Sequence, residues 1–318
     1  MESWAVSDPF CAYMSKVSRH EIGKRVNSHG FISTPELKIK KEKNTIRLVF
    51  LGESSTAGTG VNLHDTATWP WRTAQKLKKV AVGNVKIEFI NAALGGYTSF
   101  ESYGKLWSRL IYYEPDIVIV NHGWNDMYYF DYADSPFAWR NKFDFKKSGK
   151  FTLISPHWID PWIRWSQLLS KIRFWYSSSR ERGEISVSKS ILKNNFNSKG
   201  VEVFKNNIRF IRDLCSARKI ELFVCKQPTL ISKYTSENDK KRCRYEFHGF
   251  DHHAHIQAFG SLYQVLEAEN LNQIDLTSLS GKSENFYDHI HPTELGADQI
   301  AEIVADTLLR KSTYFKNN

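Results

Sequence analysis

The chain has 318 residues, of which 41% are hydrophobic, 25% charged and 14% aromatic. This balance excludes a disordered or fibrous protein, and the length allows a large α/β domain with a sizeable core. No stretch approaches the roughly 20 apolar residues of a membrane-spanning helix. The start, MESWAVSDPF, lacks the basic-then-apolar pattern of a signal peptide. A removed leader would leave no trace, and for the chain as given we expect a soluble, cytoplasmic protein.

Short apolar runs alternate with amphipathic stretches along most of the chain. Strands are predicted over 46–51, 85–90, 116–120, 220–225 and 273–276. Helices are predicted over 68–81, 98–113, 203–219, 255–269 and 293–309. Strands that alternate with helices imply a parallel sheet covered on both faces. Residues 1–44 show no clear period, so we expect an N-terminal extension followed by one domain over 45–318.

Residues 127–199 interrupt this alternation and are interpreted as an insertion after the third strand. The segment is rich in aromatic residues, and between 140 and 199 it has thirteen Lys or Arg against four acidic residues. Ligands of open α/β sheets bind outside the carboxyl ends of the strands, so an insertion there is placed to cover or shape a site. Its charge favours anionic partners such as acidic glycans, phospholipid surfaces or nucleic acid, although a solvated face explains it equally well.

Four separated segments place polar residues at predicted strand ends or just before the last helix. They are GESSTAG (52–58), NAALGG (91–96), GWND (123–126) and DHIHP (288–292). Each alone is typical of a helix cap or a tight turn. Together they offer a serine, an imidazole, a carboxylate and oxyanion donors, which are the groups that acyl transfer by serine requires.

In this order the four blocks resemble those of the SGNH hydrolases, also called GDSL-type esterases, from about residue 47 to the last helix. The resemblance implies a three-layer α/β/α sandwich with a five-stranded parallel sheet. It also implies that Ser54 is the nucleophile, that His291 is the general base and that Asp288 orients the His291 ring. Backbone N–H groups of Ser54 and Gly96 and the side-chain amide of Asn125 would form the oxyanion hole. No metal or organic cofactor is expected.

Three positions need comment. Glu53 stands where this family commonly has Asp, and a carboxylate of either length is favourable near a helix N-terminus. Asp126 is interpreted as structural. Gly95 and Gly96 both follow the second strand, and the count from Asn91 selects Gly96 for the oxyanion hole.

A second candidate constellation consists of four histidines, at positions 248, 252, 253 and 255. His248 and His252 could meet on one helical face and bind zinc, but no carboxylate or thiol with suitable spacing completes such a site. We therefore expect surface or substrate-contacting histidines. The four cysteines lack metal or CxxC spacing and are expected to be buried or free thiols. They are Cys11, Cys215, Cys225 and Cys243.

The substrate is indicated only by the insertion. Trp158, Trp162 and Trp165 would share one helical face, where they could pack the insertion onto the domain. Aromatic rings beside cations also suit sugars that carry acid groups, which favours a hydrolase removing a short acyl group, first of all acetyl, from a glycan or glycoconjugate. The same residues suit a membrane surface through 140–199 and hence a lipid ester.

Two other functions stay open at this point. An O-acyltransferase would use the same acyl-enzyme and pass the acyl group to a sugar hydroxyl instead of water. A non-catalytic glycan-binding protein is disfavoured because every group of the catalytic set is present. No nucleic-acid partner is expected, because no recognised binding module accompanies the basic segment. The acyl length, the alcohol and the oligomeric state are left open.

Overall fold

The computed structural model describes residues 5–8, 10–15, 20–21, 24–59, 65–81, 84–131, 166, 168–169, 172 and 192–316. Its centre is a five-stranded parallel sheet in the order β6-β5-β7-β8-β9. The strands are β5 (Thr45–Gly52), β6 (Lys86–Asn91), β7 (Ile117–Asn121), β8 (Glu221–Lys226) and β9 (Asn272–Asp275). The chain runs from β5 to β6 on one side and returns to β7 on the other. Sites of open α/β sheets lie at such a reversal, which here is at the end of β5.

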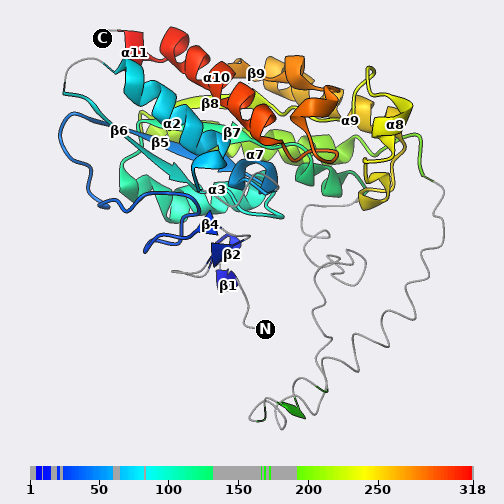
Figure 1. The fold of residues 1–318 in the computed structure, drawn as a ribbon, viewed down its shortest axis with the longest axis horizontal. Helices are drawn as coiled ribbons and strands as arrows, with labels where there is room; N and C mark the ends of the chain where they lie inside the picture. The colour runs from blue at the N-terminus through cyan, green and yellow to red at the C-terminus, as the bar shows by residue number, and fades with distance from the viewer. Residues whose placement is uncertain are drawn as a thin grey trace.

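Helices cover both faces of the sheet, so the molecule has three layers (Figure 1). One face carries α2 (Trp69–Val80) and α10 (Glu294–Lys311), and the other carries α3 (Ser99–Ser108), α7 (Lys199–Ala217) and α9 (His252–Ala268). Alternation along β5 divides the core between the faces. Leu48 and Phe50 pack with α2 and α10, whereas Val49 and Leu51 pack with α3, α7 and α9. The predicted three-layer α/β/α fold is confirmed.

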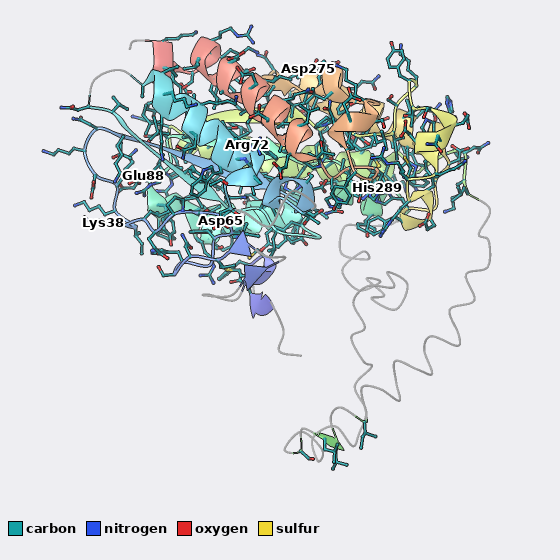
Figure 2. All side chains as sticks on the ribbon, in the orientation of Figure 1. Lys38, Asp65, Arg72, Glu88, Asp275 and His289 are labelled. Carbon is teal, nitrogen blue, oxygen red and sulfur yellow. The ribbon has the colours of Figure 1, made fainter. Side chains whose placement is uncertain are left out.

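Side-chain caps mark the starts of α2 and α9. The Thr68 hydroxyl accepts the N–H of Trp71 at 3.4 Å at the start of α2, and the Asp251 carboxylate accepts the N–H of Ala254 at 2.8 Å at the start of α9. Arg72, labelled in Figure 2, projects from α2 toward α10, where it pairs with Glu294. This pair is solvent-exposed and contributes about 0–1 kcal/mol.

Shorter elements connect the layers. The helical ones are α1 (Ser54–Ala57), η1 (Asp65–Ala67), η2 (Leu110–Tyr113), η3 (Asn125–Asp131), α8 (Glu237–Lys240), η4 (Tyr245–Phe247), η5 (Thr277–Leu279), η6 (Ser283–Asn285) and α11 (Thr313–Lys316). The helix predicted over 98–113 is therefore divided into α3 and η2, and the helix predicted from 255 begins three residues earlier, after its Asp251 cap. Within the described residues, no helix has the length and apolar character needed to cross a membrane.

The N-terminal 44 residues contain strands that the sequence pattern did not indicate. An antiparallel pair is formed by β1 (Ala5–Asp8) and β2 (Ala12–Ser15), and a second by β3 (His20–Glu21) and β4 (Lys24–Arg25). Cys11 and Met14 form a small core with Leu94 and Tyr97 of the main domain. The boundary between an extension and a domain at residue 45 stays a prediction, but the described N-terminal residues pack directly on the sheet domain.

Most of the predicted insertion 127–199, including Trp158, Trp162 and Trp165, lies outside the described residues. The described residues that flank it are joined to each other. The N–H of Asn197 donates to the carbonyl of Phe130 at 3.1 Å, and Gly200, in the first turn of α7, leaves no room for a Cβ against the Phe130 backbone. The end of η3 and the start of α7 therefore lie side by side.

Candidate active site

The turn after β5 presents Ser54 at the carboxyl edge of the sheet. A Cβ on Gly52 would lie 2.9 Å from the carbonyl oxygen of Asn121, so only glycine lets α1 turn back this closely. Helix α1 spans Ser54–Ala57 and is followed by Gly58, which has a φ of 92°. Ser54 is partly exposed, whereas its neighbour Ser55 is buried.

Ser54, His291 and Asp288 form a continuous hydrogen-bonded chain. The Oγ of Ser54 lies 2.8 Å from Nε2 of His291, and Nδ1 of His291 lies 2.8 Å from Oδ2 of Asp288. This arrangement lets the imidazole take a proton from the hydroxyl while the carboxylate holds the ring in the required tautomer. Ser55 is not part of this hydrogen-bonded chain, because its hydroxyl faces Gln227.

The loop that carries Asp288 and His291 is fixed by its own backbone. The second carboxylate oxygen of Asp288 accepts the N–H groups of Ile290 and His291, both at 2.9 Å. Burial acts to raise the pKa of Asp288, but the hydrogen bond and charge of His291 and the backbone donor outweigh it and hold the pKa well below its usual value. Asp288 is therefore ionised wherever the protein is folded near neutral pH.

The predicted oxyanion donors come from the two strands beside β5. After β6, residues Leu94–Tyr97 form a turn in which the Tyr97 N–H donates to the Leu94 carbonyl at 3.2 Å. Gly96 has a φ of 83°, which this turn position requires of a glycine. A Cβ on Gly95 would lie 3.9 Å from the Cβ of Ser54, so the turn lies beside the nucleophile. The choice of Gly96 over Gly95 stays a prediction.

Asn125 follows β7 and is buried. Its side-chain amide donates one hydrogen to the Tyr97 carbonyl at 2.9 Å, and this bond sets the orientation of the amide. The second amide hydrogen is the one that could face an oxyanion. The backbone N–H of Asn125 donates to Oε2 of Glu53 at 2.9 Å. The described structure thus brings all the predicted site residues together at one edge of the sheet.

Glu53 is completely buried beneath the site. Burial raises the pKa of its carboxyl to about 8, although hydrogen bonds from the Asn125 N–H and from Gln227 oppose the rise. Gln227 comes directly after β8 and donates to both Glu53 and Ser55. It belongs to none of the four sequence blocks, and only its place after a predicted strand could have indicated it.

Asp126 lies behind the site and not in it. Its carboxylate accepts the N–H of Ser99 at 3.1 Å and 3.2 Å, at the first residue of α3. Burial raises the pKa of Asp126 to about 7, and its hydrogen bonds with Ser99 oppose the rise. These contacts agree with the structural role that the sequence indicated.

The second histidine group was expected at the surface or in contact with substrate, and a surface position is wrong for two of its members. His248 and His255 are buried, and Nδ1 of His248 lies 3.2 Å from Nε2 of His255. His248 precedes the Asp251 cap, so it shares no helical face with His252. Both ring nitrogens of His252 already have protein partners, Tyr245 and Ser232. No group of three or more His, Cys, Asp or Glu among the described residues could hold a metal ion.

The buried histidines surround Trp124 of the GWND block. Its ring centroid lies 4.4 Å from that of His248 and 4.2 Å from that of His289, which is labelled in Figure 2. An aromatic cluster therefore supports the Asn125 loop from behind. All four cysteines are buried, as expected.

Comparison with known proteins gives a consistent assignment. The model of the GDSL-like Lipase/Acylhydrolase family matches residues 50–174, a segment that contains the first three blocks. A comparison with curated proteins found no match.

Solved structures of similar proteins include a lipase/acylhydrolase from Enterococcus faecalis, which is 14% identical and has a TM-score of 0.47. The match covers 83% of this chain and 95% of that protein. A GDSL-like lipase from Bacteroides thetaiotaomicron has 14% identity, 86% and 91% coverage, and a TM-score of 0.44. The acetyl xylan esterase AlAXEase has 12% identity, 83% and 100% coverage, and a TM-score of 0.47.

Proposed function

We propose that this chain, of which residues 50–174 match the GDSL-like Lipase/Acylhydrolase family, hydrolyses carboxylic esters with Ser54, His291 and Asp288 as a catalytic triad. The observation that carries this proposal is the unbroken chain of 2.8 Å contacts from the Ser54 hydroxyl through His291 to Asp288. These residues come from opposite ends of the domain sequence, and nothing in the packing of the helices alone requires their alignment.

The reaction proceeds through an acyl-enzyme. Ser54 Oγ attacks the ester carbonyl as its proton passes to Nε2 of His291, and Asp288 stabilises the imidazolium. The tetrahedral oxyanion receives hydrogen bonds from the N–H groups of Ser54 and Gly96 and from the amide of Asn125. Each such donor typically contributes about 3–4 kcal/mol of transition-state stabilisation.

Collapse of this intermediate breaks the bond to the alcohol, which leaves with the proton from His291. Water then attacks the acyl-serine while His291 takes one of its protons. A second collapse releases the acid and returns the proton to Ser54 Oγ.

The proposed substrate is an acylated, first of all acetylated, carbohydrate. Tyr287 supports this, because its ring is 40% exposed beside the catalytic imidazole, where a flat aromatic face suits a sugar ring. The aromatic and basic composition of 140–199 favours an anionic glycan. Two alternatives share the same acyl-enzyme: transfer of the acyl group to a sugar hydroxyl, and hydrolysis of a lipid ester at a membrane surface.

A panel of chromogenic esters with acyl chains of increasing length, followed by acetylated glycans, tests this proposal. We expect acetate to be the preferred acyl group and acetylated glycans to be deacetylated. A preference for long chains, enhanced by vesicles, would favour the lipid alternative. Assays with and without an acceptor sugar separate hydrolysis from transfer, because only a transferase makes a new sugar ester.

A further inference from the structure

Gln227 lies at the centre of a buried hydrogen-bond network beneath the site. It is 1% exposed and follows the last residue of β8. Its Oε1 accepts the N–H of Trp124 at 2.8 Å, and its Nε2 donates to Oε1 of Glu53 at 2.5 Å and to Oγ of Ser55 at 3.2 Å. One side chain thus joins the ends of three strands.

The orientation of this amide follows from its partners. A backbone N–H can only donate, so the amide oxygen must face Trp124. The two amide hydrogens then face the Glu53 carboxyl and the Ser55 hydroxyl, and each polar atom of the side chain has a partner. A buried group satisfied in this way stabilises one arrangement of its neighbours, because any shift would leave a donor or acceptor unpaired.

Glu53 extends the network to the oxyanion donor. One of its oxygens faces Gln227, and the other accepts the N–H of Asn125 at 2.9 Å. The backbone N–H groups of Trp124 and Asn125 therefore donate to Gln227 and Glu53 respectively. These two side chains are also hydrogen-bonded to each other. Both side chains also contact or adjoin the turn that carries Ser54.

The position of Gln227 itself is fixed by two further contacts. The hydroxyl of Tyr263 on α9 donates to the Gln227 carbonyl at 2.5 Å. On the other side, a Cβ on Gly123 would lie 2.8 Å from Oε1 of Gln227, so any side chain at position 123 would push against this amide. Gln227 is therefore held between α9 on one side and the chain at Gly123 on the other.

We propose that Gln227 is a positioning residue for acyl transfer. It fastens the Trp124–Asn125 backbone to the Glu53–Ser55 turn and so sets the separation between the Asn125 amide and the Ser54 hydroxyl. This role rests on the proposed function. A displacement of about 1 Å in such a constellation can cost roughly 100-fold in rate, which gives a hydrogen bond beneath the site a large effect on kcat.

Gln227→Met tests this role, because methionine has a similar length and shape and no amide. We expect kcat on a chromogenic acetate to fall by about 10- to 100-fold, with KM changed by less than about twofold. The matched control is Gln273→Met on β9, which removes a partly buried amide that donates to the Leu266 carbonyl. This control should keep the wild-type kcat.

A double-mutant cycle identifies the residue through which Gln227 acts. In an Asn125→Ala background, Gln227→Met should lower kcat by no more than about threefold, since the donor that it positions is already absent. If Gln227→Met lowered kcat by the same factor with and without Asn125→Ala, the proposal would be overturned. A wild-type kcat in Gln227→Met alone, with Ser54→Ala inactive, would also overturn it. If Ser54→Ala keeps the wild-type rate, the proposed function itself has failed.

Gln227→Glu provides a second variant that keeps the shape of the side chain. A protonated Glu at this position can still donate to Glu53, but once both carboxyls are ionised they would repel each other. We therefore expect the activity of this variant to fall as pH rises through neutrality, whereas that of the wild type rises. Parallel pH profiles, with thermal unfolding confirming that both proteins are folded, would contradict the role.

Discussion

Tyr287 and His291 lie face to face at the site. Their ring planes differ by 16°, their centroids are 5.5 Å apart, and the N–H of Tyr287 donates to the carbonyl of His291 at 3.1 Å. The five residues from Tyr287 to His291 therefore carry both the proposed general base and an exposed aromatic residue beside it. In the proposed function, this aromatic face would contact the sugar of the ester.

Replacing Tyr287 should affect sugar esters more than simple esters. Tyr287→Leu is expected to lower kcat/KM for an acetylated oligosaccharide by about 2- to 10-fold more than for a chromogenic acetate, because aromatic contacts contribute about 0.5–1.5 kcal/mol. Tyr287→Phe should stay close to wild type. Tyr112→Leu, at a ring that is 66% exposed before the start of β7, serves as the control. Equal losses on both substrates would exclude a sugar-binding role.

The two adjacent serines can be separated by substitution. Ser54→Ala should abolish ester hydrolysis, with a loss of at least about 1000-fold, because the nucleophile is removed. Ser55→Ala removes only a hydrogen bond from Gln227 and should retain most of the activity. Steady-state rates and labelling by a serine-directed inhibitor measure both. Activity that survives in Ser54→Ala and disappears in Ser55→Ala would place the nucleophile one residue later.

The pH dependence of hydrolysis reports on the base. Activity should rise with pH if His291 is the base, since only a neutral imidazole can accept the proton of Ser54. Asp288 stays ionised over this range because its pKa is held well below the usual value, so it adds no second step. Initial rates between mildly acidic and neutral pH test this. A flat profile there would be incompatible with His291 as the base.

Stability should depend on pH through buried histidines. Burial lowers the pKa of His122 and His289 to about 3 and of His255 to about 4, and lowers that of His248 as well. In the unfolded chain these groups take up protons below about pH 6.5, whereas in the folded protein they do not. The free energy of unfolding should therefore fall on acidification below this pH.

Two buried carboxyls act in the opposite direction. The pKa of Glu53 is raised to about 8 and that of Asp126 to about 7, so both bind protons in the folded state and lose this stabilisation as pH rises through those values. Near pH 5.5 the histidines with lowered pKa values outnumber these two carboxyls, so the free energy of unfolding should still fall as the pH drops. Urea unfolding should give a maximum near neutral pH. A protein that gains stability between pH 6.5 and 5 would contradict this balance.

The sequence predicted the sheet and the main site residues because their signals are local. Each strand is a short apolar run, and each block follows a strand end or precedes the last helix, so the order of elements alone brings Ser54, Asn125 and His291 to one edge. The break between α3 and η2 has no comparable signal, since the residues around Arg109 continue the apolar period of the helix.

Residues that act through tertiary contacts were not predictable in the same way. Gln227 is a single polar residue after a strand, and its role depends on partners 174 and 172 positions away. His248 and His255 are polar by type and were expected at the surface. They are buried because Trp124 packs against both rings, and that contact depends on how β7 and α9 meet.

The hydrogen bond between Asn197 and Phe130 has an evolutionary consequence. It closes the two chain segments on each other directly after the last site residue of the GWND block, so residues 132–191 contribute none of the proposed catalytic groups. Long connections add little to the free-energy cost of closing a loop, so a change in the length of that stretch need not break this hydrogen bond. Relatives of this protein could therefore acquire new substrates by diverging in this stretch while the chemistry at the sheet edge stays the same.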